Sequence, residues 1–164
     1  MTRVRVLSGD DWATWRAVRL RSLREDPGAF GSTYARELGF DEAVWRGRLD
    51  DPESVSVLAG EDLAPLGIGA GFPDRPGLLH VVAMWVVPEA RGNGVAHQVL
   101  RVLEEWAARR GLGLHLDVVR GNAVARRSYE RYGFVATGET EQVGAGPDEV
   151  HERMLLDRTV SGTP

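Results

Sequence analysis

Residues 91–96, Arg91-Gly92-Asn93-Gly94-Val95-Ala96, have the types and spacing of an anion-binding segment. They lie between an apolar run and an amphipathic helix, at a helix start where backbone N–H groups lack partners and the dipole adds positive potential. Glycines have no Cβ, so a phosphate can approach the main chain, and Arg91 adds charge. The segment therefore suits a pyrophosphate. It lacks the Lys-Ser/Thr of a P-loop and the G-x-G-x-x-G of a dinucleotide fingerprint, and on its own it also fits a plain helix cap.

A second stretch with chemical potential begins at Asn122. A helix is expected between Asn122 and Gly133, because Asn is a favourable N-cap residue and Gly is a favourable residue after the last turn. Ala125, Tyr129 and Tyr132 share one face of that helix, at positions i, i+4 and i+7. Tyrosines at this spacing are usually core aromatics with a solvated hydroxyl, which is the expectation for Tyr132. A phenol has a pKa of about 10 and stays protonated at neutral pH, so Tyr129 is a usable proton donor.

Apolar periodicity predicts the elements that must position these groups. The run at residues 78–87 is nearly all apolar, which is typical of a strand buried on both faces. Strands and helices alternate in the middle of the chain, which predicts an α/β (α+β) fold with at least one parallel strand pair bridged by a helix. Residues 29–34 fit a short helix or a loop, 73–77 a turn and 138–149 a polar loop. We expect strands at 4–7, 55–59, 65–72, 78–87, 114–119, 134–137 and 150–156, and helices at 10–24, 41–49, 94–110 and 123–132.

Two motifs occur in sequence order, separated by one helix and one strand. They are Arg91-x-x-Gly94-x-Ala96, preceded by Val86-Val87-Pro88, and Asn122-x-x-Ala125-x-x-x-Tyr129, followed by Gly133-Phe134. Together they resemble the GCN5-related N-acetyltransferase (GNAT) superfamily, over roughly residues 55–156. The helices before residue 50 match only in number. The resemblance implies a GNAT fold, with a mixed central sheet of about six to seven strands, about four helices and splayed parallel strands around the coenzyme site.

The same resemblance implies an N-acetyltransferase that uses acetyl-CoA as co-substrate. Backbone amides of residues 91–96 would hold the pyrophosphate, with His97 in the first helical turn near a phosphate. The bulged strand before them would pair with the pantetheine arm through Trp85 and Val86, and Asn122 would lie near that arm. Acetyl transfer from a thioester expels a thiolate, and Tyr129 would protonate it as the general acid.

The general base is left open by the sequence. Many family members use a Glu on the long buried strand, but the matching stretch here, residues 81–83, has no carboxylate. His80, slightly earlier on that strand, is the best single candidate. His115, Asp117 or a base acting through ordered water are alternatives, and His151 could face the acceptor. The four histidines do not have metal-ligand spacing, so no metal is expected.

Acceptor specificity in the superfamily lies in the first two helices, their loop and the last hairpin. In the first region we expect Phe30, Ser32, Tyr34 and Glu37 to contact the acceptor. The second region carries the acidic residues Glu139, Glu141, Asp148 and Glu149. Acidic groups suit a cationic amine, and they are equally what a solvated loop shows.

The composition limits the classes of partner that this chain is expected to bind. The chain has 164 residues, a net charge of −4 and no Cys, which gives no case for nucleic acid and excludes disulfides and thiolate chemistry. No apolar run reaches membrane-spanning length and the N-terminus lacks a signal peptide, so a cytoplasmic protein without membrane contact is expected. We expect one domain at residues 1–157, a frayed tail at 158–164 and a homodimer, the commonest assembly.

Three functions remain on these grounds. The first is acetyl transfer to a primary amine of a small molecule, protein or peptide by direct attack, with Tyr129 as acid. The second is a non-catalytic module that senses acetyl-CoA, which would have no need for that acid. The third is transfer from another acyl-CoA donor, against which the small Ala83 argues mildly when the acyl group is charged.

Overall fold

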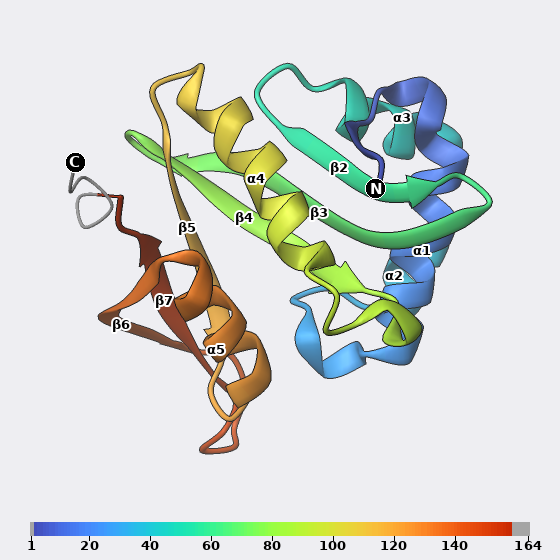
Figure 1. Ribbon diagram of the computed structural model, residues 1–164. Coiled ribbons are helices and arrows are strands. Elements are labelled where there is room, and N and C mark those ends of the chain that lie inside the picture. The colour runs from blue at the N-terminus through green and yellow to red at the C-terminus, as the bar shows by residue number, and fades with distance from the viewer. Residues whose placement is uncertain (1, 159–164) are drawn as a thin grey trace.

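A single mixed sheet of seven strands, in the order β1-β2-β3-β4-β5-β7-β6, forms the centre of the computed structural model, which describes residues 2–158 (Figure 1). The strands are β1 (Val4–Val6), β2 (Val55–Glu61), β3 (Ala64–Arg75), β4 (Leu78–Val86), β5 (Gly113–Val119), β6 (Phe134–Gln142) and β7 (Val150–Leu156). The α-helices are α1 (Trp12–Glu25), α2 (Tyr34–Leu38), α3 (Glu42–Asp50), α4 (Val95–Ala108) and α5 (Ala123–Tyr132), with 3-10 turns at Gly9–Asp11, Pro27–Ala29 and Pro88–Ala90. These elements confirm the expected α/β class.

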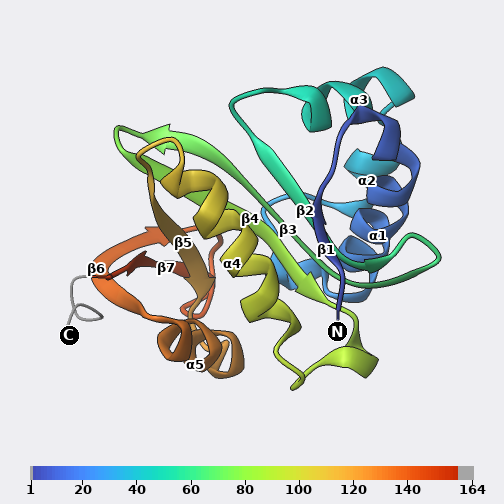
Figure 2. The same ribbon diagram turned by 45° about the horizontal axis from the view of Figure 1, so that its top comes forward.

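Helices cover both faces of the sheet. Helix α4 crosses one face, and α1 and α3 lie on the other (Figures 1 and 2). Val99 and Leu103 on the apolar stripe of α4 are completely buried, as its amphipathic pattern predicts. The helix approaches β3 so closely that a Cβ at Gly69 would lie 2.6 Å from Val99 Cγ1. This close contact fixes the start of α4 relative to the sheet.

The pair β4–β5 is the parallel pair predicted from the alternation of elements. It is hydrogen-bonded only from Leu78 to Val81 on β4 and from Gly113 to Leu116 on β5. Helix α4 connects the two strands. Beyond Val81, the rest of β4 pairs with β3 alone among the described residues. The main chain of residues 82–86 is therefore open on its β5 side, which is the splayed arrangement that the resemblance implied.

The structure differs from the sequence expectations at four places. Residues 34–38 form α2, so the described residues contain five α-helices rather than about four. Strand β6 continues to Gln142 through the first part of the predicted loop, and β3 continues to Arg75 through the first part of the predicted turn. Arg158, expected to be frayed, forms an ion pair with Glu104 at 2.6 Å. The rest of that expected tail, residues 159–164, lies outside the described residues.

Candidate active site

An open cavity of about 460 Å³ lies where β4 and β5 separate. It brings together residues that are far apart in the sequence: both predicted catalytic residues, His80 and Tyr129, and two of the predicted acceptor residues, Phe30 and Ser32. The full lining is Arg19, residues 29–32, residues 80–84, Leu116, Asp117, Tyr129, Glu141, Val143 and His151. One site thus holds a candidate acid and a candidate base.

A β-bulge shapes the β4 wall of this cavity. Ile68 pairs with Trp85 and Ala70 with Val82, so two β4 residues lie opposite one β3 residue. Ala83, within the bulge, has φ of 58°, a left-handed conformation that costs a non-glycine residue about 1–3 kcal/mol. Such bulges re-aim the chain near functional sites. Here the bulge lies on the part of β4 that lines the cavity.

Tyr129 projects from the middle of α5 into the cavity wall. Its ring contacts Phe134 edge to face, with centroids 5.8 Å apart. Within residues 2–158, the hydroxyl makes no hydrogen bond with another residue. Burial raises the pKa of Tyr129 to about 12, so the phenol carries its proton throughout the neutral range. A protonated hydroxyl without a hydrogen-bond partner, placed on the cavity wall, is what a general acid requires.

His80 lies on β4 between two carboxylates. Its Nδ1 is 3.1 Å from Asp74 Oδ2, and its Nε2 is 3.7 Å from Asp117 Oδ2. Burial lowers the pKa of His80 below its usual 6.5, against the effect of both carboxylates. The imidazole is therefore neutral at pH 7 and able to accept a proton.

The alternative base candidates on β5 are engaged with β7. Arg153 binds Asp117 through two nitrogens, Nε at 2.5 Å and Nη2 at 3.1 Å, and its Nη1 contacts His115 Nδ1 at 2.9 Å. Fully buried His115 in turn contacts Asp74 Oδ1 through Nε2, at 2.6 Å. These contacts occupy both ring nitrogens of His115, which does not line the cavity, whereas His80 and His151 both do.

Asp74, His80 and His115 also present three potential ligand atoms within 4.8 Å of one another. Arg153 argues against a metal there. A guanidinium can only donate, so His115 Nδ1 must accept and its proton is on Nε2. A metal at Nε2 would displace that proton to Nδ1, where an Arg153 N–H already points. The cluster therefore fits a proton-holding network better than a metal site.

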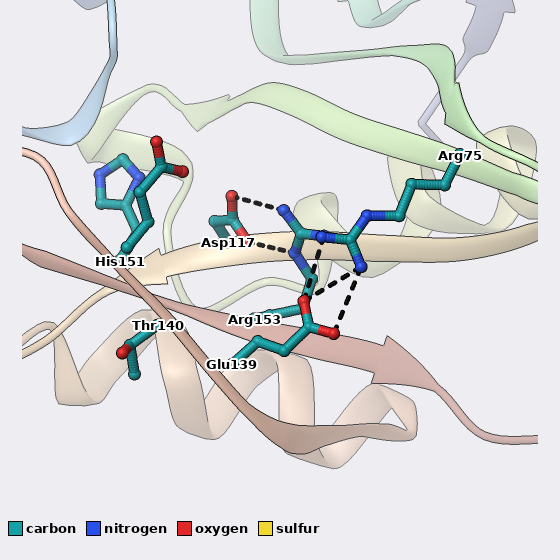
Figure 3. Close-up of a pocket in the computed structure, with 7 residues that line it drawn as sticks. Arg75, Asp117, Glu139, Thr140, His151 and Arg153 are labelled. Carbon is teal, nitrogen blue, oxygen red and sulfur yellow. Dashed lines mark hydrogen bonds and ion pairs between the residues drawn. The ribbon is translucent and has the colours of Figure 1, made fainter.

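A second, smaller cavity of about 250 Å³ adjoins the first and shares Asp117, Glu141 and His151 with it. Figure 3 shows its charged side chains: Arg153 bridges Asp117 and Glu139. Of the acidic residues expected to meet the acceptor, Glu139 and Glu141 line this cavity. Glu149 instead accepts a hydrogen bond from the backbone N–H of residue 146, within its own loop.

The glycine segment has the geometry expected of a close-approach loop. Gly92 and Gly94 have φ of 80° and 78°, and α4 begins directly afterwards at Val95. A Cβ at either glycine would meet nothing within 4 Å, so the space beside the loop is open. The Asn93 side chain turns back on the loop and donates to Ala90 O at 3.2 Å. The main chain, rather than Asn93, is thus the surface offered to a ligand.

Arg91 and Trp85 meet at one carboxylate that the sequence did not indicate. Asp26, at the end of α1, accepts from Trp85 Nε1 at 2.6 Å and from Arg91 Nη2 at 3.1 Å through the same oxygen. Arg91 Nε also donates to Val86 O at 2.9 Å. Because the Trp85 side chain is buried, only its main chain remains for a coenzyme. In this structure, Arg91 joins the glycine loop to α1.

Two residues expected near the coenzyme, His97 and Asn122, and the expected core residue Tyr132 have structural contacts. His97 Nε2 contacts Ser128 O at 2.9 Å and links α4 to α5, so it is less solvated than the sequence suggested. Asn122 caps α5, accepting from Ala125 N at 3.2 Å. Tyr132 donates to Glu104 at 2.7 Å, which fits its expected structural role.

Two expected acceptor residues, Tyr34 and Glu37, do not line the cavity. Glu37 is 1% exposed and accepts two hydrogen bonds from Arg19, at 3.1 and 3.0 Å. Burial raises the pKa of Glu37, but the bonds from Arg19 and Ser32 outweigh this and lower it overall. Its carboxylate fixes Arg19 in the cavity wall instead of facing an acceptor.

The sequence reading missed Asp74, Arg153 and Asp26. Asp74 lies in a Pro-rich stretch that reads as a turn, yet it occupies a second bulge, where Pro73 pairs with Leu79 and Arg75 with Leu78. No local pattern marked it, because the register that pairs Phe72 of β3 with His80 of β4 exists only in the folded sheet. Arg153 and Asp26 become recognisable only once strands and helices from distant parts of the chain are packed together.

Comparisons with known proteins identify the family. Residues 15–134 match the family model described as "Acetyltransferase (GNAT) family". Acetyltransferase Atu2258 from Agrobacterium fabrum is 37% identical over 101 residues, covering 61% of this chain and 72% of that protein. The structure of YncA from Salmonella typhimurium with its cofactor acetyl-CoA matches with a TM-score of 0.74 and 18% identity, over 95% of this chain and 93% of that one. A nourseothricin acetyltransferase structure matches with a TM-score of 0.58 and 31% identity, over 65% and 66% of the two chains.

No described helix combines the length and apolar character needed to cross a membrane. The cytoplasmic location and the homodimer stay predictions. The family match covers most of the chain and includes the glycine segment and α5. The chain therefore belongs to the acetyltransferase (GNAT) family and is an acetyl-CoA-dependent N-acetyltransferase.

Proposed function

We propose that this enzyme transfers acetyl from acetyl-CoA to a primary amine by direct attack, with Tyr129 as general acid and His80 as general base. The observation that carries the proposal is that both side chains line one cavity with the bulged main chain of β4. A neutral amine attacks the thioester carbonyl, His80 Nε2 accepts the amine proton, and Tyr129 donates a proton to the leaving thiolate. Solvent then restores both residues.

The donor half of the site is argued from the main chain. In this proposal the pyrophosphate binds at the N-terminus of α4, against the amides of residues 91–96, where the two left-handed glycines leave open space. The pantetheine arm extends along the unpaired side of β4, pairing with the main chain at Trp85 and Val86. Asn122 would lie beside that arm, at the start of α5.

The acceptor is proposed to enter past Phe30 and Ser32 on one side and Glu141 on the other. Asp117 and Glu141 give this end acidic character, which suits an amine that is cationic in solution. The acceptor class is a small-molecule amine or a peptide amine. The name of the nourseothricin acetyltransferase, a relative over part of the chain, points to a small molecule in that protein.

The test is a panel of small amines, amino acids and peptides incubated with acetyl-CoA, with free thiol release as the readout. We expect amine-dependent thiol release from at least one class, and little release when Tyr129 is changed to Phe. Acetyl-CoA should also raise the Tm, because a ligand of the native state stabilises it. Stabilisation without thiol release from any amine would favour the sensor, and faster release from succinyl- or propionyl-CoA would favour the other acyl donors.

A further inference from the structure

Five polar side chains from four neighbouring strands form a closed ring beside the cavity. Asp74 contacts His80 and His115, His115 contacts Arg153, Arg153 binds Asp117, and Asp117 faces His80. Four of the five are half-buried or buried, and the distances lie between 2.5 and 3.7 Å. Only His80 and Asp117 of this ring line the main cavity. Asp74, His115 and Arg153 do not line this cavity and contact the two residues that do.

The direction of each hydrogen bond follows from what each group can donate. Arg153 can only donate, so His115 Nδ1 accepts and His115 Nε2–H donates to Asp74 Oδ1, at 2.6 Å. Asp74 is therefore fixed through Oδ1, and Oδ2 faces His80 Nδ1 at 3.1 Å. The β3 bulge at Asp74 aims the side chain inward at this point.

We propose that Asp74 is a positioning residue that holds the His80 proton on Nδ1 and leaves the Nε2 lone pair for the amine, with His115 and Arg153 fixing Asp74 in turn. The inference rests on the proposed role of His80 as general base. Asp74 touches neither the acceptor nor the coenzyme in this scheme, because it does not line the cavity. It acts through the tautomer and orientation of the imidazole.

The same arrangement favours the proton transfer itself. As the amine nitrogen forms its bond to the acetyl carbon, the amine proton passes to His80 Nε2, while the C–S bond breaks and the thiolate takes the Tyr129 proton. The resulting imidazolium lies between Asp74 and Asp117. Burial raises the pKa of each of these carboxyls, but the hydrogen bond from His115 to Asp74 and that from Arg153 to Asp117 outweigh it, so each pKa is lowered and both remain ionised.

The surroundings of His80 are defined on every side. Strand β3 contributes Asp74 and the Phe72 ring, β5 contributes His115 and Asp117, and β7 contributes Arg153. The carboxylates of Asp74 and Asp117 favour the protonated form of His80, whereas His115 and Arg153 oppose it. Losing Asp74 therefore lowers the pKa of His80 further.

Changing Asp74 to Asn tests the inference sharply because an amide has one acceptor and one donor side. Arg153 still forces His115 Nε2–H toward Asp74, so the amide oxygen must face His115. The amide NH₂ then faces His80 Nδ1, which must accept, and the His80 proton moves to Nε2. The general base then presents an N–H to the amine, in place of a lone pair.

Nitrogen-15 NMR of histidine-labelled protein measures the tautomers directly. In the wild type we expect the proton on Nδ1 of His80 and on Nε2 of His115, with assignments from His80→Asn and His115→Asn. In Asp74→Asn we expect His80 to change to the Nε2–H tautomer. A wild-type His80 that carries its proton on Nε2 would overturn the positioning role, and this measurement does not depend on how any Asp74 variant folds.

Kinetics supply the second readout. We expect Asp74→Asn to lower kcat by about 10²- to 10⁴-fold, the range of general acid–base catalysis, with little change in acceptor KM or acetyl-CoA affinity. The acidic limb of its pH profile should move to lower pH, and Asp74→Glu should recover part of kcat. Asp62→Asn is the matched control, the same change in the β2–β3 turn, where Asp62 pairs with Arg5 at 2.6 Å, and its kcat should be unchanged.

His80→Asn separates failure of this inference from failure of the proposed function. If His80→Asn abolishes the acidic limb and lowers kcat while Asp74→Asn behaves like wild type, His80 is the base and the Asp74 role is wrong. If His80→Asn retains wild-type kcat at all pH values, the base assignment is wrong and the positioning role falls with it. Loss of kcat in both variants, with the expected tautomers, supports both.

Discussion

Replacing Tyr129 with Phe removes one hydroxyl and leaves the ring that packs against Phe134 in place. Within the described part of the chain this hydroxyl has no hydrogen-bond partner, so its loss should leave the free energy of unfolding nearly unchanged. If Tyr129 is the general acid, kcat should instead fall by about 10²- to 10⁴-fold. The variant thus separates chemistry from stability.

The pKa of Tyr129 sets the expected pH dependence. Burial raises it from 10.0 to about 12, which disfavours the phenolate. The wild-type rate should therefore show no loss from ionisation of this acid up to about pH 10, because about 1% or less of the phenol is then ionised. Thiol release followed across the alkaline range, with saturating acceptor, measures this directly.

Tyr132→Phe on the same helix is the matched control. Tyr132 donates a hydrogen bond to the partly exposed Glu104 at 2.7 Å. Losing this hydrogen bond should cost about 1 kcal/mol of stability and lower the Tm by about 2–4 °C. Its kcat should be unchanged. The reasoning is refuted if Tyr129→Phe keeps wild-type kcat, or if Tyr129→Phe loses stability and kcat together as a misfolded variant would.

Three further changes test other parts of the site. Gly94→Ala imposes a side chain at φ of 78°, which should cost about 1–2 kcal/mol of stability and weaken acetyl-CoA binding about tenfold. Gly77→Ala is the control, because Gly77 has φ of 76° and equally open space around it. This control should lose the same stability but keep the affinity for acetyl-CoA, which calorimetry measures. Glu37→Gln leaves Arg19 buried without its carboxylate and should cost about 3–5 kcal/mol in urea unfolding; unchanged stability with a raised acceptor KM would return Glu37 to the acceptor site. Burial lowers the pKa of His80, so below pH 6.5 the unfolded chain binds more protons than the folded protein, and stability falls as the pH drops toward the pKa of the folded state. His80→Gln should therefore reduce the difference in unfolding free energy between about pH 7.5 and about pH 5.5. An equal difference in the wild type and the variant would contradict the lowered pKa.

Local patterns predicted most elements, including the two helix starts on which the proposed donor half of the site rests. The glycine segment and α5 could be predicted because helix starts, caps and apolar stripes depend on residues close together in the chain. Gly94 and Asn122 lie at the helix starts where the sequence put them. The strand that ends before residue 88 was visible from its apolar run alone.

Partners across the sheet could not be predicted in this way. Strand β6 is at the sheet edge and exposed along nearly its whole length, so it shows no alternation to mark its extension to Gln142. Asp74 was hidden because a bulge shifts the register within a stretch rich in Pro and Gly. The ring around His80 depends on four strands, and Arg153 is 73 positions from His80 in the sequence. Only packing brings such groups together.

A single oxygen of Asp26 lies between the proposed coenzyme loop and the segment that leads to the proposed acceptor side. It accepts from Arg91 beside the proposed coenzyme loop, and Asp26 directly precedes the segment that carries Phe30 and Ser32 to the proposed acceptor side. A coenzyme phosphate that competes for the guanidinium would change the partner of that oxygen. Any resulting effect on acceptor affinity must equal the effect of the acceptor on coenzyme affinity, because thermodynamic coupling is reciprocal. Four dissociation constants, measured with and without the second ligand in the wild type and in Asp26→Asn, would give the size of that coupling.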